Sequence, residues 1–160
     1  MLCFHFSLCK LTPPTIEKLS LDIVYDKKDE VQAYLNAFPE YDLNQFDQHG
    51  HAPIHFVQTC QMLEILRNHG INLDTKTQDK MSTTLLQLSI KSGNDKVRDC
   101  LVEMKANVNV EDAEKKNPLA QCIEVQDLDC VEKLLPLVNK RLVHFFGLHS
   151  GSSLETTMYN

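Results

Sequence analysis

The chain has 160 residues, of which 42% are hydrophobic and 24% charged, a composition typical of one globular domain with a core of moderate size. Its 22 acidic residues outnumber its 16 basic ones, and the resulting net charge of −6 argues against a general affinity for nucleic acid or anionic lipid. No apolar run reaches the length that crosses a bilayer, so membrane insertion is not expected.

The first residues, MLCFHFSLCKL, form a short apolar segment. A secretion signal places basic residues before its apolar stretch and small residues at a cleavage site, whereas here Lys10 comes after the stretch and Pro13 follows soon afterwards. The pattern therefore does not indicate a signal peptide. We expect this segment to pack onto the end of the domain.

The first helical unit is expected to start near Thr12 and Pro13. Behind them, Ile16, Leu19 and Ile23 recur at the spacing of one helix face. The charged run YDKKDE that follows is interpreted as a loop between two helices, because mixed charges of this kind are normally solvated. A helix–loop–helix unit is the prediction for this part of the chain.

From Asp47 onward the sequence repeats itself. The stretches DQHGHAPIHFV, DKMSTTLLQLSIKSG and DAEKKNPLAQCIEVQ begin at Asp47, Asp79 and Asp112, so their starts lie 32 and 33 residues apart. Each stretch is followed by a second run of apolar residues at helical spacing. A period of this length predicts a structural repeat, in which a turn precedes two antiparallel helices.

Local signals place the ends of these helices. Thr84 and Asn117 can accept hydrogen bonds from the amides of the helices that follow them, as capping residues do. In the unit that begins at Asp47 only Val57 to Met62 join the two apolar stretches, so its first helix or connecting loop should be trimmed. Pro136 should end or kink the last helix, because proline removes a hydrogen bond.

The unit from Asp47 resembles an ankyrin repeat, whose turn and first helix read D-x-x-G-x-T-P-L-H-x-A-A. The residues that match this pattern are Asp47, Gly50, Pro53, Ile54 and His55. The resemblance implies an all-α fold, an ankyrin-repeat solenoid of about four helix-turn-helix units with degenerate N- and C-terminal caps. It implies a domain over 1–149, with repeats at about 15–46, 47–78, 79–111 and 112–138, a C-terminal cap at 139–149 and a flexible tail at 150–160.

Ankyrin repeats commonly bind protein partners through a concave face formed by their turn tips and first helices. Carrying those positions over gives the expected partner-binding residues Phe46, Gln48, His49, His51, Gln78, Lys80, Met81, Thr83, Lys91, Ser92, Glu111, Glu114, Lys116 and Glu124. The resemblance thus implies a monomeric, non-catalytic module that binds another protein and needs no cofactor. It leaves the identity of the partner open.

The histidines near the first repeat could also be drawn as metal ligands. His49, His51 and His55 lie close to Cys60, but this spacing matches no standard zinc site, and the resemblance gives His55 a structural role. The six cysteines form no CxxC pair or regular framework, so we expect them to be reduced. No metal site is predicted here.

Two further hypotheses remain open. Metal binding or cysteine-dependent catalysis could use histidines and cysteines near the two ends of the chain, namely Cys3, His5, Cys9, His144 and His149. Small, eroded ankyrin arrays also resemble effectors that intracellular bacteria deliver into host cells, and the tail SSLETTMYN is similar to some secretion signals. The expected location is accordingly the cytoplasm, including that of a host cell after secretion.

Overall fold

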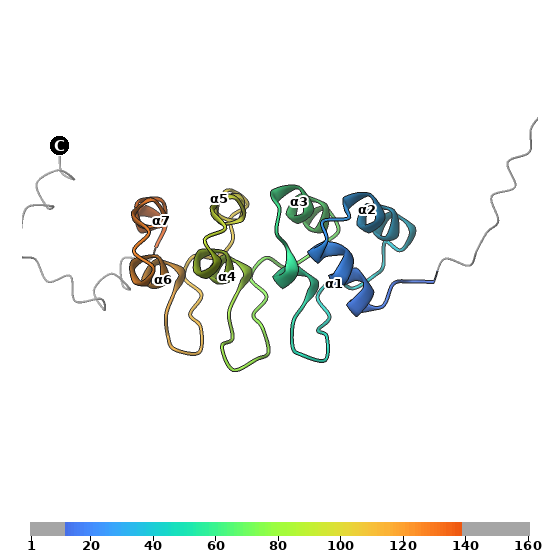
Figure 1. Cartoon of the computed structure of the whole chain (residues 1–160), viewed down its shortest axis with the longest axis horizontal. Helices are drawn as coiled ribbons and strands as arrows, with labels where there is room; N and C mark the ends of the chain where they lie inside the picture. Colours follow the sequence, from blue (N-terminus) through green and yellow to red (C-terminus); the bar gives the residue numbers. More distant parts are fainter. Residues whose placement is uncertain (1–11, 139–160) are drawn as a thin grey trace, which may run out of the picture.

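The computed structural model describes residues 12–138, and this part of the chain is built from helices and loops without any β-strand. The expected all-α class is confirmed for these residues. The helices come in consecutive pairs that stand side by side in a row, from α1 and α2 at the blue end to α6 and α7 at the orange end (Figure 1). The predicted cap at 139–149 and tail at 150–160 lie outside the described residues.

The row has two layers. The first helix of each pair packs toward the first helix of the next pair, and the second helices follow the same order over α2, α3 and α5. The pairs are α1 (Ile16–Val24) with α2 (Lys28–Ala37), the 3₁₀ helix η1 (Pro53–Phe56) with α3 (Cys60–Asn68), α4 (Leu85–Ser92) with α5 (Asp95–Glu103), and α6 (Pro118–Glu124) with α7 (Leu128–Leu134), which the 3₁₀ helix η2 (Leu135–Leu137) follows.

Most helices begin at a side chain that accepts a hydrogen bond from the first turn. Thr84 accepts from the N–H of Gln87 and Asn117 from that of Ala120, as the sequence predicts. At the first helix the prediction is wrong by three residues, since Thr15 caps α1 in place of Thr12. The two prolines between them explain the shift, because a residue that precedes proline is disfavoured in helical conformation.

The two irregular helix ends lie where the sequence places them. The first helix of the second pair is only the four-residue 3₁₀ helix η1, which confirms the trimming expected from the short segment before α3. Helix α7 ends at Leu134, and Pro136 sits in the 3₁₀ turn η2 that follows. Proline there removes the N–H that a continuing α-helix would need.

One apolar core runs through the row and is contributed by every pair. Its members include side chains with no more than 1% exposed surface: Leu19, Ile23, Leu35, Ile54, Leu63, Leu66, Leu86, Leu101 and Leu134. Because each helix pair buries its apolar face against its neighbours, the row depends on contacts between pairs as well as within them.

Four cysteines are joined in two disulfides, which corrects the expectation of reduced thiols. Cys60 at the start of α3 is bonded to Cys100 in α5, with Cα atoms 5.9 Å apart, and Cys122 in α6 is bonded to Cys130 in α7, with Cα atoms 5.6 Å apart. Both separations are ordinary for disulfides. The spacing of cysteines along the chain could not show this, because the packing of α3 on α5 brings together residues 40 positions apart.

Reduction should destabilise the protein chiefly through the longer of the two closed loops. We expect reductant to lower the free energy of unfolding by up to about 4 kcal/mol for the Cys60–Cys100 bond, because opening this loop restores entropy to the unfolded chain. Urea unfolding with and without reductant measures this. The Cys60→Ser/Cys100→Ser variant should lose most of the response, and four titratable thiols among these cysteines in the unreduced protein would contradict the pairing.

The last two pairs are also held by a buried arginine. The guanidinium of Arg98 in α5, only 1% exposed, pairs with Asp127 at 2.7 Å and Asp129 at 2.6 Å, both from the start of α7. It also pairs with Asp95 at 2.8 Å and Asp99 at 2.9 Å on its own helix. Each of the three guanidinium nitrogens therefore donates to a carboxylate, the arrangement that makes burial of this cation tolerable.

Replacing Arg98 with Met should therefore cost about 2 to 3 kcal/mol of folding free energy. Met retains the apolar stem but leaves four carboxylates without their shared partner, and two of these are more than half exposed, which moderates the loss. Lys133→Met is the matched control. Lys133 bridges Asp99 and Asp129 at the surface, where solvent screens the pairs, so its replacement should cost clearly less than that of Arg98 in the same urea titration. Equal losses would show that burial of Arg98 is unimportant.

Candidate functional site

Three long loops, at 38–52, 69–84 and 104–117, project from the same side of the row (Figure 1). Near the tip of each loop, an aspartate side chain holds the backbone in a turn by accepting hydrogen bonds from N–H groups. The Asp47 carboxylate accepts the N–H groups of His49 and His51 at 2.9 and 2.8 Å, and Asp112 accepts those of Glu114 and Lys116 at 2.9 and 3.0 Å. The three aspartates that mark the sequence period thus shape the loop tips.

Asp79 holds the turn of the middle loop in the same way. Its carboxylate accepts the N–H groups of Met81 and Ser82, both at 3.0 Å, and the hydroxyl of Thr77 at 2.7 Å. These bonds, led by the one from Thr77, hold the pKa of Asp79 below its usual range. The carboxylate that sets the turn therefore stays ionised.

Backbone hydrogen bonds join neighbouring tips to one another. The N–H of Gln78 donates to the carbonyl of Gly50 at 2.8 Å, and the N–H of Ala113 donates to the carbonyl of Met81 at 3.0 Å. Gly50 is required at this junction, because its φ is +79° and an added Cβ would lie 2.9 Å from Cβ of Gln78. The tips consequently form one connected strip.

Further hydrogen bonds fix the bases of the loops. The side chain of Asn44 accepts the N–H of Asn72 at 2.9 Å, and Asp74 accepts the N–H of Asn107 at 2.7 Å. These bonds run from each loop to the next one along the row. The loops are therefore tied to their neighbours at both the tip and the base.

His55 supports the first loop from the core. It is 8% exposed, its Nδ1 accepts the N–H of Ala52 at 2.9 Å, and its Nε2 donates to the carbonyl of Thr75 at 2.9 Å. Both ring nitrogens are used by backbone groups of two different loops. Burial is the main reason that the pKa of His55 is lowered, so the neutral ring is favoured.

The structure places most of the sequence-predicted binding residues on the surface of this strip or beside it. The exposed ones are Gln48, His49, Gln78, Lys80, Met81, Lys91, Ser92, Glu114 and Glu124. The half-buried ones are Phe46, His51, Glu111 and Lys116. Phe46 packs against the core, and the ring of His51 lies 5.7 Å from that of Phe56, so these two are less available than their positions in the sequence suggest.

Thr83 does not belong to this surface. It is 2% exposed, its N–H donates to the hydroxyl of Thr77 at 3.0 Å, and its carbonyl accepts the N–H of Thr77 at 2.8 Å. Thr83 therefore joins the two sides of the middle loop, and its side chain is buried. A pattern-based transfer of positions could not distinguish it from its exposed neighbours.

Charges on the strip change along the row. Lys80 lies on the middle tip, whereas Glu111 and Glu114 lie on the last one. Lys116 is held between Glu114 at 2.8 Å and Glu124 at 2.9 Å, and these bonds, first that to Glu114, raise its pKa. The last tip therefore carries three acidic residues, Glu111, Asp112 and Glu114, against two lysines, Lys115 and Lys116, of which Lys116 is paired within the tip.

Asp112 is the most enclosed carboxylate of the three tips. Burial acts to raise its pKa, but hydrogen bonds from the N–H of Lys116, from the side chain of Gln121 and from the N–H of Glu114 outweigh burial and lower it. Lys91 adds its charge at 3.6 Å. This cluster links helix α4 to the last loop.

No group of three or more His, Cys, Asp or Glu side chains among residues 12–138 could hold a metal ion. The alternative based on the terminal residues Cys3, His5, Cys9, His144 and His149 falls outside the described range. Within that range no helix is long and apolar enough to pass through a bilayer.

No model of a known protein family matches the chain, and a search of curated proteins finds no significant match. Sequence reasoning missed two features of the structure, the Arg98 cluster and a pocket beside α1. Each of them is formed by residues from separate elements. The four aspartates around Arg98, spread over 95–129, give no local pattern that could have revealed the cluster.

Replacing His55 with Ala should destabilise the loops that it connects. We expect a loss of about 3 kcal/mol in the free energy of unfolding, because the N–H of Ala52 and the carbonyl of Thr75 lose their buried partner. His49→Ala, at the exposed tip, should change stability by less than about 0.5 kcal/mol. Thermal or urea unfolding compares them, and similar losses would remove the structural role assigned to His55.

The same variant tests a pH dependence. Because the pKa of His55 is lower in the folded chain, the unfolded chain binds more protons as the pH falls below about 6.5, the ordinary histidine value. The contribution of His55 is therefore complete above that pH and is lost on acidification toward the folded-state pKa. In His55→Ala the decline of stability between about pH 6.5 and 5 should be shallower than in the parent.

Proposed function

We propose that the chain is an ankyrin-like repeat module without catalytic activity, which binds another protein across its three loop tips. The observation that carries this proposal is the connected strip, in which Gly50 is bonded to Gln78 and Met81 to Ala113 through the backbone. A surface tied together in this way loses little conformational freedom on binding. The proposal also explains why the aspartate period and the row of helix pairs occur together.

The side chains on the strip suit a protein partner. Met81 is 42% exposed on the middle tip, and an exposed, adaptable thioether is common at binding surfaces. His49 and Gln48 lie on the first tip, and the acidic pair Glu111 and Glu114 lies on the last. A partner with an apolar centre and a basic side chain opposite the last tip would be complementary to this order.

Partner capture from a cell extract tests the proposal. The variant His49→Ala/Met81→Ala/Glu114→Ala changes one exposed residue on each tip, avoiding Phe46 and His51 because these also support the fold. We expect at least about a tenfold loss of the captured protein, since central contacts of an interface each contribute on the order of 1 kcal/mol or more. The melting temperature should stay within the range of the parent protein.

The matched control is Glu64→Ala/Lys96→Ala/Glu132→Ala, three exposed residues on the second helices α3, α5 and α7. This variant should retain capture. If the control lost its partner while the loop-tip variant kept it, binding would lie on the helical face and the proposed surface would be wrong.

The proposals on delivery and location rest on separate grounds. Transfer into a host cell is a hypothesis from the tail at 150–160, outside the described residues. The expected cytoplasmic location rests on reduced cysteines and on the resemblance to delivered effectors. The two disulfides remove the first of these grounds, because disulfides are typical of oxidising compartments. The loop-tip surface does not depend on either.

A further inference from the structure

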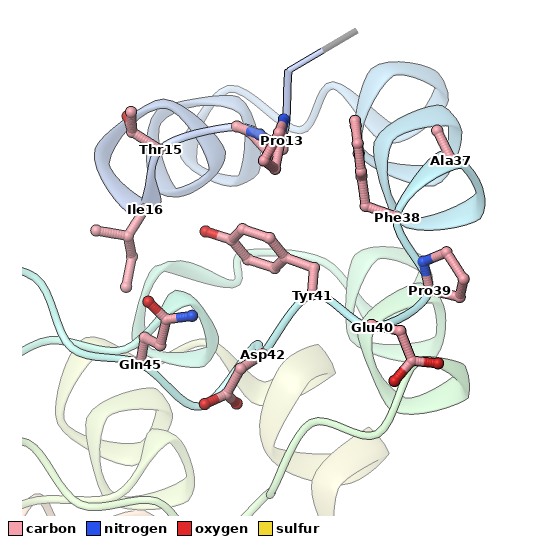
Figure 2. Close-up of a pocket in the computed structure, with 11 residues that line it drawn as sticks. Pro13, Thr15, Ile16, Ala37, Phe38, Pro39, Glu40, Tyr41, Asp42 and Gln45 are labelled. Atoms are coloured by element: carbon pink, nitrogen blue, oxygen red, sulfur yellow. The ribbon is translucent and has the colours of Figure 1, made fainter.

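A pocket of about 630 Å³ lies at the end of the row that carries α1 and α2. One wall is the segment that enters α1, including Pro13 and Ile16, and the other is the loop that leaves α2, including Phe38, Pro39 and Tyr41. Figure 2 shows the ring of Tyr41 extending across the space between these walls, below Pro13. The volume is in the range that holds several apolar side chains.

The lining of this pocket selects for a particular occupant. Its walls are mainly apolar, and the only charged side chains among the lining residues are those of Glu40 and Asp42. Burial, followed by the nearby carboxylates of Glu17 and Asp42, raises the pKa of Tyr41, which is consistent with a partly enclosed and negative environment. An apolar segment that carries a positive charge fits both properties.

We propose that this pocket is the docking site of residues 1–11 of the same chain. In MLCFHFSLCKL the large apolar residues Leu2, Phe4, Phe6 and Leu8 alternate with smaller or polar ones, so an extended segment would present them on one side. The segment has no acidic residue and carries one lysine, Lys10, to face the acidic edge of the pocket. It has the chemistry that the walls select.

Covalent attachment favours this occupant over a separate molecule. Leu11 is two residues from Pro13, which itself lines the pocket. Eleven residues span up to about 36 Å when extended, enough for the segment to reverse and lie across the opening. A tether this short gives an effective concentration on the order of millimolar or higher, so a free peptide of similar affinity would compete poorly. This inference does not rest on the loop-tip function.

A photo-crosslink in the full chain tests the proposal directly. A benzophenone analogue of phenylalanine is placed at position 6, and after irradiation the crosslinked peptides are identified by mass spectrometry. We expect crosslinks within one chain to 13–16 and 37–45. The same analogue at position 25, where Tyr25 is 66% exposed just after the end of α1, serves as the control and should not give that pattern. Crosslinks to other regions, or between two chains, would overturn the proposal.

Hydrogen exchange provides the second measurement. The variant Phe4→Ser/Phe6→Ser should speed exchange of the amides in 37–45 by about tenfold, because the cover of the loop is lost. Exchange in α4 to α7 should be unchanged, which shows that the variant is folded. Unaltered exchange in 37–45, or equal binding of an apolar dye by parent and variant, would mean that the segment does not occupy the pocket.

Discussion

One aspartate carboxylate in each long loop sets the shape of the loop-tip surface. Asp47, Asp79 and Asp112 each accept N–H groups from residues two to four positions further along, and so turn the backbone sharply. In a turn made in this way, the backbone carbonyl groups of Gly50 and Met81 can accept hydrogen bonds from the next loop. The N–H groups of Gln78 and Ala113 donate these bonds. If an aspartate lost its charge, the tip and its connection to the neighbouring tip would weaken together.

The same molecule shows two ways of joining one helix pair to the next. Neighbouring loops are joined by backbone hydrogen bonds at their tips and by bonds from backbone N–H groups to the side chains of Asn44 and Asp74 at their bases. Helices α5 and α7 are joined by one buried cation, Arg98, which serves carboxylates from both. The first kind divides its contribution among several bonds, whereas the second concentrates it in one residue.

The features that the sequence predicts well are those determined by residues close together in the chain. The period of the aspartates, the caps Thr84 and Asn117, and the break at Pro136 depend on neighbouring residues, and the structure confirms each cap and break. Features formed by distant residues were missed or misjudged. The Cys60–Cys100 bond, the burial of Thr83 and the pocket around Tyr41 arise from how elements pack, which residue spacing alone cannot convey.

The disulfides bear on the setting of the protein more than on its proposed binding surface. Both join helices, Cys60 to Cys100 between α3 and α5 and Cys122 to Cys130 between α6 and α7, whereas the loop tips project to one side of the helical row (Figure 1). A reducing cytosol would open these bonds and lower stability, yet the hydrogen bonds that connect the tips involve no sulfur. The redox environment should thus govern how long the folded protein persists, while the aspartate-set loops form the surface that we propose for binding.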